Sequence, residues 1–125
     1  MIVLDYKDRR PIYEQVMERL QELMLIGVLG QDEKLPSVRS LATELSINPN
    51  TIQRAYMELE RQGYIYSVKG KGSFVADLSR MKHMKWAELE SGLEEIAGKA
   101  ARLGVSGEEF VRLARDAYGK AGESV

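Results

Sequence analysis

The first apolar pattern of the chain begins after Pro11. From there, apolar positions recur at spacings of four, four, three and four residues, which lays one stripe along a predicted helix. The stripe consists of Ile12, Val16, Leu20, Leu23 and Gly27. Proline suits the first turn of a helix because its missing amide would have no partner there. Two glycines and a proline in GVLGQDEKLPS then end the helix.

Two shorter helical patterns follow, joined by a tight turn. Ser37 is a candidate N-cap for a helix over VRSLATEL, and Asn48 followed by Pro49 suits the start of another. The second of these helices is expected to run to about Gln62, with Gly63 as its stop. The apolar residues of the two helices are Leu41, Ala42 and Leu45, then Ile52, Ala55, Tyr56 and Leu59.

Small polar side chains occupy the first turns of the later helix, outside its apolar stripe. They are Asn50, Thr51, Gln53 and Arg54. Two short helices with amide and guanidinium groups at the start of the second are typical of a helix-turn-helix motif that enters the DNA major groove. Amides pair with adenine edges, and arginine pairs with guanine or phosphate. A good helix cap explains Asn48, Pro49 and Thr51 equally well, so these three leave both interpretations open.

A β-hairpin is predicted directly after this helix. YIYSV is rich in β-branched and aromatic residues, KGKG supplies a tight turn, and SFVAD resumes as an extended strand. The tip carries Lys69, Gly70 and Lys71, which suit a phosphate backbone or the minor groove, although a solvated turn explains the lysines in isolation. Three helices followed by a basic hairpin is the order of a winged helix-turn-helix domain.

A helical tail is predicted beyond Asp77. Ser79 is a candidate cap for a helix with a seam of almost three heptads, and Ser106 with Glu109 forms a capping box for a last helix. The seam comprises Trp86, Leu89, Leu93, Ile96, Ala100 and Leu103, and the last helix carries Phe110, Val111, Leu113, Ala114, Ala117 and Tyr118. This is more apolar surface than two isolated helices can hide.

The tail either folds back on its own chain or packs against a second tail across a two-fold axis. We favour the second arrangement, with the heptad seam, Phe110, Ala114 and Tyr118 as the dimerisation surface. The expected fold is mainly α with a small β-hairpin. A winged helix-turn-helix domain over residues 1–77 precedes a two-helix dimerisation tail over residues 78–125.

Composition narrows the classes of protein. The 125 residues are 44% hydrophobic and 30% charged, with no cysteine, which excludes disulfides and thiolate metal sites. No window approaches the roughly 18 apolar residues of a membrane span, and no signal peptide precedes the first helix, so a cytoplasmic protein without a membrane partner is expected. A lone histidine, His83, and the lack of a partnered nucleophile predict no enzyme activity, no cofactor and no metal.

Charge is unevenly distributed along the chain. The formal net charge is -1, yet residues 34–72 carry six basic and three acidic side chains, a local balance of +3. The six basic residues are Lys34, Arg39, Arg54, Arg61, Lys69 and Lys71. A basic face is therefore compatible with a nearly neutral chain.

Residues 10–77 resemble the DNA-binding domain of the GntR family of bacterial transcription regulators. The resemblance lies in PIYEQV, LPSVRSLATELSINPNTIQRAYMELERQGYI and KGKGSFV, and NPNTIQRAY with a short tail is similar to the YtrA-type branch. It implies a homodimer, usually a repressor, bound to a two-fold operator in double-stranded DNA. The DNA contacts that it implies are Ser37, Arg39, Asn48, Asn50, Thr51, Gln53, Lys69, Gly70 and Lys71.

Two residues depart from the family pattern. Val38 stands where an acidic residue is common, which weakens the expected capping, and Gln53 stands where many members have arginine, so their operator consensus does not transfer. The tail is too small to enclose a metabolite pocket of the kind found in the larger effector domains of the family. An unknown small-molecule effector, if there is one, would bind at the dimer interface.

Two functions remain as hypotheses. In the first, the chain is a sequence-specific repressor in which Asn50, Gln53 and Arg54 read bases. Arg39, Thr51, Lys69 and Lys71 hold phosphates or a groove edge. In the second, the winged helix is a protein-interaction module without specific DNA binding, and the tail binds a different partner.

Overall fold

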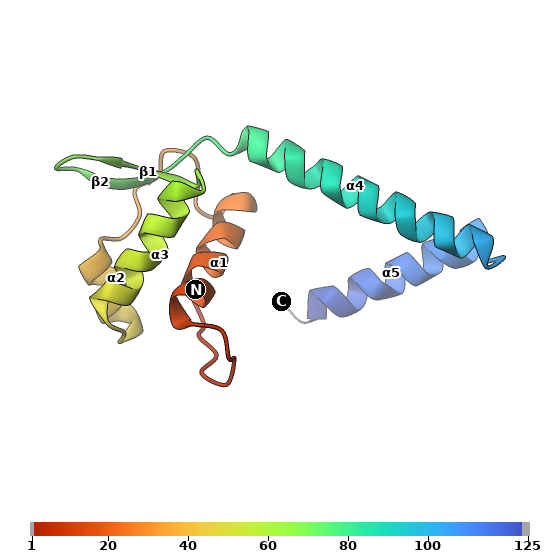
Figure 1. The fold of residues 1–125 in the computed structure, drawn as a ribbon, viewed down its shortest axis with the longest axis horizontal. Helices are drawn as coiled ribbons and strands as arrows, with labels where there is room; N and C mark the ends of the chain where they lie inside the picture. Colours follow the sequence, from red (N-terminus) through yellow and green to blue (C-terminus); the bar gives the residue numbers. More distant parts are fainter. Residues whose placement is uncertain (1, 124–125) are drawn as a thin grey trace. The chain divides into compact units, whose positions relative to one another are not determined.

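The computed structural model describes residues 2–123, which form two compact units divided between Lys82 and His83. The first unit contains α1 (Ile12–Leu25), α2 (Val38–Leu45), α3 (Pro49–Arg61), β1 (Ile65–Val68) and β2 (Gly72–Val75) (Figure 1). Helix α4 (Ser79–Arg102) begins in the first unit and continues into the second, which also contains α5 (Gly107–Glu123). The order of helices and hairpin agrees with the sequence prediction.

Helix α3 is the centre of the first unit, because it packs against both α1 and α2. Its predicted inward stripe is confirmed, since Ile52, Ala55 and Leu59 are fully buried and Tyr56 is nearly so. The predicted α1 stripe is confirmed at Val16, Leu20 and Leu23 but is wrong at Gly27. That glycine lies after the end of α1, with φ at 85°, and so belongs to a turn.

Local hydrogen bonds define the helix-turn-helix as the sequence predicted. The Ser37 side chain accepts a hydrogen bond from the Ser40 amide at 3.0 Å, and Asn48 Oδ1 accepts one from the Asn50 amide at 2.8 Å. Ser46 adopts the left-handed conformation at the end of α2, which lets the chain turn within two residues of the next cap. The two caps therefore fix where each helix begins.

The hairpin has a third strand-like neighbour, in a segment that the sequence predicts only as the break after the first helix. Strands β1 and β2 are antiparallel, with Val68 opposite Gly72 across a three-residue tip. On the other side of β2, Asp32 N donates to the carbonyl of Val75 at 2.8 Å, and Leu35 N donates to that of Ser73 at 2.9 Å. The wing is thus tied to the segment that precedes α2.

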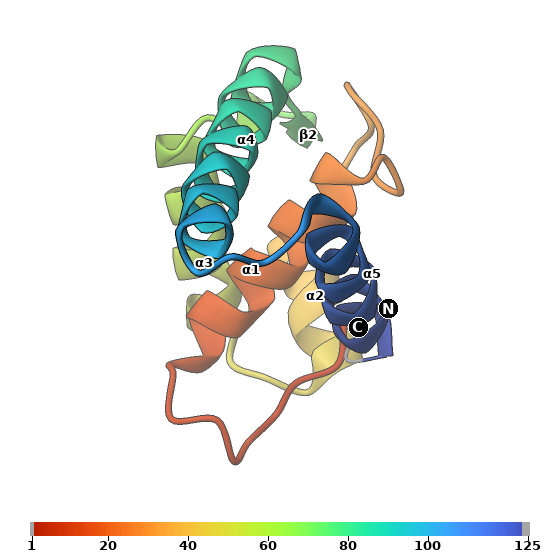
Figure 2. The same cartoon turned by 90° about the vertical axis from the view of Figure 1, so that its right-hand side faces the viewer.

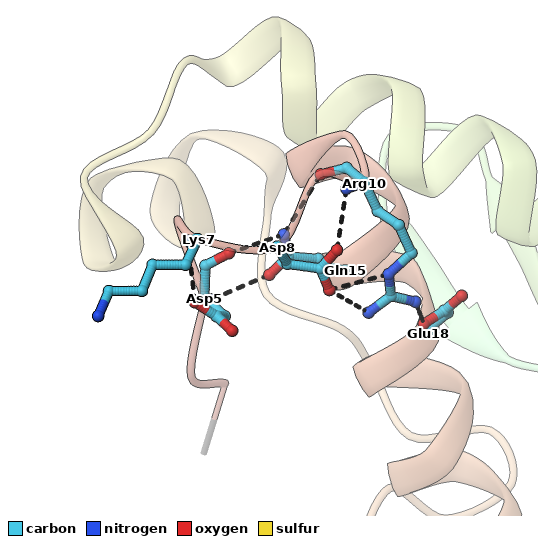
Figure 3. A network of polar contacts seen from close by, with 6 residues as sticks. All are labelled: Asp5, Lys7, Asp8, Arg10, Gln15 and Glu18. Carbon is cyan, nitrogen blue, oxygen red and sulfur yellow. Dashed lines mark hydrogen bonds and ion pairs between the residues drawn. The ribbon is translucent and has the colours of Figure 1, made fainter.

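The N-terminal arm is held against α1 by the amide side chain of Gln15. Its Oε1 accepts a hydrogen bond from Asp5 N at 2.9 Å, and its Nε2 donates to the Asp5 carbonyl at 3.1 Å (Figure 3). In the same network, Arg10 forms ion pairs with Asp8 and Glu18. Because the arm's Ile2 and Leu4 are half-buried against the core, it packs on its own domain.

The start of α4 differs from the prediction, because Ser79 is the first helical residue and not the cap. The first helical hydrogen bond runs from Lys82 N to the Leu78 carbonyl at 2.8 Å. Asp77 Oδ1 accepts the Ser79 amide at 3.0 Å and also the Ser79 hydroxyl. These hydrogen bonds lower the pKa of the Asp77 carboxyl. Leu78, the residue before α4, is buried in the core of the first unit.

The second unit exposes its apolar side chains. Helices α4 and α5 are joined by a turn at residues 103–106 (Figure 2), and the predicted capping box at Ser106 and Glu109 is confirmed by bonds of 3.1 and 3.4 Å. Neither helix has a buried residue. Trp86 is 64% exposed and Leu89 66%. No helix among residues 2–123 is long and apolar enough to cross a membrane.

Candidate nucleic-acid interface

The start of α3 leaves one face unpacked. Asn50 and Gln53 are exposed, whereas their neighbour Ile52 is fully buried. Residues three apart lie on the same face of a helix, so the two amide side chains point away from the core together. Thr51 is half-buried beside them. The helix thus offers two adjacent amide groups, each with a donor and an acceptor.

Asn48 serves as a cap and keeps a free donor. Its Oδ1 accepts the Asn50 amide, while its Nδ2 takes part in no hydrogen bond within residues 2–123. The side chain is exposed. Capping and an outward contact therefore use different atoms of the same amide and are compatible with each other.

Helix α2 presents Arg39 from its first turn. The Arg39 side chain is exposed, and Ser37 provides the cap. Val38, which departs from the acidic residue common in the family, is half-buried and packs against the core. The valine therefore contributes apolar contact to the helix start, and the cap from Ser37 is retained.

The tip of the wing is exposed and basic. Lys69, Gly70 and Lys71 are all exposed, and Lys71 N donates to the Val68 carbonyl at 2.9 Å to close the turn. Gly70 has φ at 78°, a conformation that other residues rarely adopt. Behind the tip, the Tyr66 and Phe74 rings stack at 5.7 Å between centroids, which stiffens the hairpin.

The wing and the start of α2 lie next to each other. They share a hollow of about 400 Å³, whose lining includes Ser37, Val38, Gly70 and Lys71. The sequence could not show this proximity, because more than thirty positions separate Ser37 from Lys71. Ser37, Arg39 and the basic tip, which were predicted separately, therefore lie on neighbouring parts of one surface.

Five of the six basic residues of the central segment form no ion pair within residues 2–123. They are Lys34, Arg39, Arg54, Lys69 and Lys71. Arg61 differs, since its Nη2 lies 2.8 Å from Glu58 Oε2. That hydrogen-bonded pair lowers the pKa of the Glu58 carboxyl and raises the pKa of the Arg61 guanidinium. The five basic residues without an ion pair thus lie on or next to α2, the start of α3 and the wing.

Sequence reasoning missed one contact of this surface, between Arg54 and Tyr13. The Arg54 guanidinium carbon lies 4.0 Å from the centroid of the Tyr13 ring. Both residues line a hollow of about 460 Å³ with Pro11, Ile12, Asn50 and Thr51. The signal in the sequence is weak, because a tyrosine in PIYEQV is compatible with simple core packing.

No metal site accompanies this surface in the part of the chain that the structure describes. Within residues 2–123, no group of three or more histidine, cysteine, aspartate or glutamate side chains could hold a metal ion. The chemistry of the surface consists of amide, hydroxyl and guanidinium groups with lysine ammonium groups. Such groups recognise a partner through hydrogen bonds and charge.

Three helices, an exposed polar start to α3 and a basic hairpin define a winged helix-turn-helix domain of a transcription regulator. The family model for bacterial regulatory proteins of the gntR family matches residues 12–75, and the chain belongs to this family. The resemblance found in the sequence is thereby confirmed.

Named relatives agree with this assignment. The chain is 37% identical over 112 residues to the HTH-type transcriptional repressor YtrA of Bacillus subtilis, covering 88% of this chain and 86% of YtrA. The solved structure of a GntR family transcriptional regulator from Listeria monocytogenes matches with a TM-score of 0.67 at 33% identity, over 90% of this chain and 98% of that one. Similarity to YtrA thus extends into the tail.

A further solved structure includes DNA. The DNA-binding domain of AraR in complex with its operator ORE1 matches with a TM-score of 0.53 at 33% identity. The match covers 61% of this chain and 93% of the AraR domain. The fold of the winged helix-turn-helix domain is therefore that of a domain solved on its operator.

Proposed function

We propose that the chain is a repressor that binds, as a homodimer, to a two-fold operator in double-stranded DNA. The observation that carries this proposal is the unpacked start of α3, where Asn50 and Gln53 are exposed above a fully buried Ile52. The proposal is supported by the similarity of this chain to YtrA, which is named a transcriptional repressor, and to the AraR domain that was solved in complex with an operator. Repression follows if the dimer occupies a promoter that RNA polymerase needs.

The residue roles follow from chemistry and position. Asn50 and Gln53 would read base edges in the major groove, because amide side chains match adenine. The positively charged and hydroxyl groups around them would hold phosphates or a groove edge, namely Arg39, Thr51, Lys69 and Lys71. Ser37, Asn48 and Gly70 complete the contact surface, with Asn48 donating through its free Nδ2.

The second unit is proposed to form the dimer. Its exposed apolar residues form a continuous seam, and a partner's seam would cover it. A two-fold dimer also meets a geometric need, since two recognition helices must lie about 34 Å apart to read successive turns of one DNA face. We accordingly assign DNA binding to residues 1–77 and dimerisation to residues 78–125.

DNA binding also implies a cellular location for the protein and a site at which a small molecule would regulate it. A protein that binds bacterial promoters works in the cytoplasm. A small-molecule effector, if one acts on this chain, would bind where two tails meet and change their spacing.

The proposal is tested by stoichiometry and by transcription. A duplex selected by the full chain is titrated in sedimentation velocity, and two chains per duplex are expected. The same duplex placed within a promoter should lower the yield of transcript in a purified transcription reaction as protein is added. A single bound chain would contradict the dimer, and an unchanged or higher yield would contradict repression.

A further inference from the structure

Arg54 is held by one of its faces. Its guanidinium lies over the Tyr13 ring at 4.0 Å, a distance typical of a cation–π contact. Tyr13 belongs to the first turn of α1, is half-buried and packs against the core. Since α1 and α3 also pack against each other, the ring is a fixed platform for the arginine.

The donor edge of Arg54 is free. Within residues 2–123, Arg54 forms no hydrogen bond or ion pair. Its natural partner one helical turn later is Glu58, but Arg61 occupies that carboxylate with bonds of 3.0 Å from Nε and 2.8 Å from Nη2. A stacked guanidinium with unused in-plane donors is prepared for an acceptor from another molecule.

The free N–H donors of Arg54 lie beside Asn50, one of the predicted base-reading residues. Arg54 and Asn50 are four residues apart, so they share one face of α3, and both line the hollow of about 460 Å³. Arg10, which precedes this hollow in the chain, is already engaged by Asp8 and Glu18 (Figure 3). Arg54 is therefore available to an anion at this position, whereas Arg10 is paired.

We propose that Tyr13 is a positioning residue that holds Arg54 for a two-pronged contact with one DNA phosphate, and that Arg54 reads no base. The planar fork of arginine matches two phosphate oxygens, and stacking fixes the plane of that fork before DNA arrives. Stacking on α1 also keeps the guanidinium at the α1 side of α3, away from the bases that Gln53 would contact. This inference rests on the proposed DNA binding and assigns α1 a part in it.

A phosphate contact contributes affinity without sequence information, so removing it weakens all duplexes alike and lowers the salt slope by about one. Loss of the ring should weaken binding less than loss of the guanidinium, because the charge remains but is no longer held. A cation–π contact at an exposed site corresponds to an affinity change of about two- to fivefold.

The experiment is a double-mutant cycle on operator affinity with the full chain. The probe is a duplex recovered from a random pool by the wild-type chain, and the variants are Tyr13→Leu, Arg54→Ala and the double variant. Tyr13→Phe is the matched control, since it keeps the ring. Thermal unfolding of each variant identifies any that fail to fold. Dissociation constants are measured at several salt concentrations and on duplexes with single base changes.

The proposal expects Tyr13→Leu to weaken binding about two- to fivefold and Tyr13→Phe to bind like wild type. In the double variant, loss of the ring should add nothing to loss of Arg54. Additive effects, or a changed base preference in Arg54→Ala, would overturn the proposal. If wild type prefers no duplex over a scrambled one, the proposed function fails instead, so the two failures are distinguishable.

Discussion

The phenol of Tyr56 donates a 2.7 Å hydrogen bond to the carbonyl oxygen of Pro36. Tyr56 lies midway along α3, and Pro36 directly precedes the cap of α2. The bond therefore ties the helix with the predicted base-reading residues to the start of the helix that presents Arg39. The tyrosine as a whole is only 5% exposed.

Replacing Tyr56 with phenylalanine should destabilise the domain. The Pro36 carbonyl would lose its donor, and a lost hydrogen bond of this kind costs about 1 kcal/mol of the free energy of unfolding. Burial also raises the pKa of Tyr56 to about 12, against about 10 for tyrosine in an unfolded chain. Since the folded state holds this proton more tightly, stability is retained below about pH 10 and falls as pH rises toward about 12.

Urea unfolding at a series of pH values checks both expectations for Tyr56→Phe. The variant should be less stable than wild type near neutral pH, and its stability should fall less steeply above about pH 10. Tyr66→Phe is the control for stability near neutral pH alone, because its exposed hydroxyl donates to Asp32 at 2.8 Å and that hydrogen bond also raises the pKa of Tyr66. Equal stability of Tyr56→Phe and wild type would show that the Pro36 bond contributes nothing.

Asn48→Asp separates capping from DNA contact at one position. Aspartate still accepts the Asn50 amide, so the free energy of unfolding should stay within about 0.5 kcal/mol of wild type. The variant loses the Nδ2 donor and gains a negative charge, so operator affinity should fall about tenfold or more. Calorimetry and fluorescence anisotropy measure the two quantities. Unchanged affinity would assign Asn48 to capping alone.

Substitutions of Gln53 and Lys71 should change DNA binding in different ways. Gln53→Ala should relax preference at one base pair by about 1 to 3 kcal/mol, because only a base reader distinguishes sequences. Lys71→Ala should weaken all duplexes alike and lower the salt slope by about one. Binding of a panel of single-base variants across salt concentrations measures both. Lys85→Ala, which removes an exposed charge of α4, serves as control. A salt slope for Lys71→Ala equal to that of wild type would remove the wing tip from the contact surface.

A charge placed in the apolar seam should dissociate the dimer and leave the protomer folded. Ile96 is 57% exposed in the single chain, so Ile96→Glu removes little packing within it but would bury a carboxylate between two tails. Sedimentation equilibrium should report a monomer with weak operator binding. Ser91→Glu adds the same charge at an exposed position outside the seam and should remain dimeric. A dimeric Ile96→Glu variant would place the interface elsewhere.

The sequence was sufficient where the determining contacts are local. The caps at Ser37 and Asn48 and the box at Ser106 are each completed within three residues, so short patterns predict them. The stripe of α3 was also readable, because helical periodicity alone selects the buried face. Asn50, Thr51, Gln53 and Arg54 could be predicted as DNA contacts for the same reason, since they lie outside that stripe. The predicted contacts of Ser37 and Arg39 came instead from the resemblance to the GntR family.

Contacts between distant segments were not readable from the sequence. The pairing of Asp32 and Leu35 with β2 depends on a register set about forty residues later. Gln15 looks like an ordinary surface amide of α1, yet it is buried and holds the backbone of Asp5. The prediction of Ser79 as a cap is wrong because serine and aspartate are both good helix caps. Here the Asp77 side chain accepts the hydrogen bond from the Ser79 amide.

Selection of bound sequences from a random duplex pool by the full chain tests the central claim most directly. The account predicts a single enriched motif with two-fold symmetry, whose half-sites are centred about 10 base pairs, or a multiple of that distance, apart. Enrichment of that motif should shrink for Gln53→Ala at one position in each half-site. A pool that shows no sequence preference after selection would contradict the account.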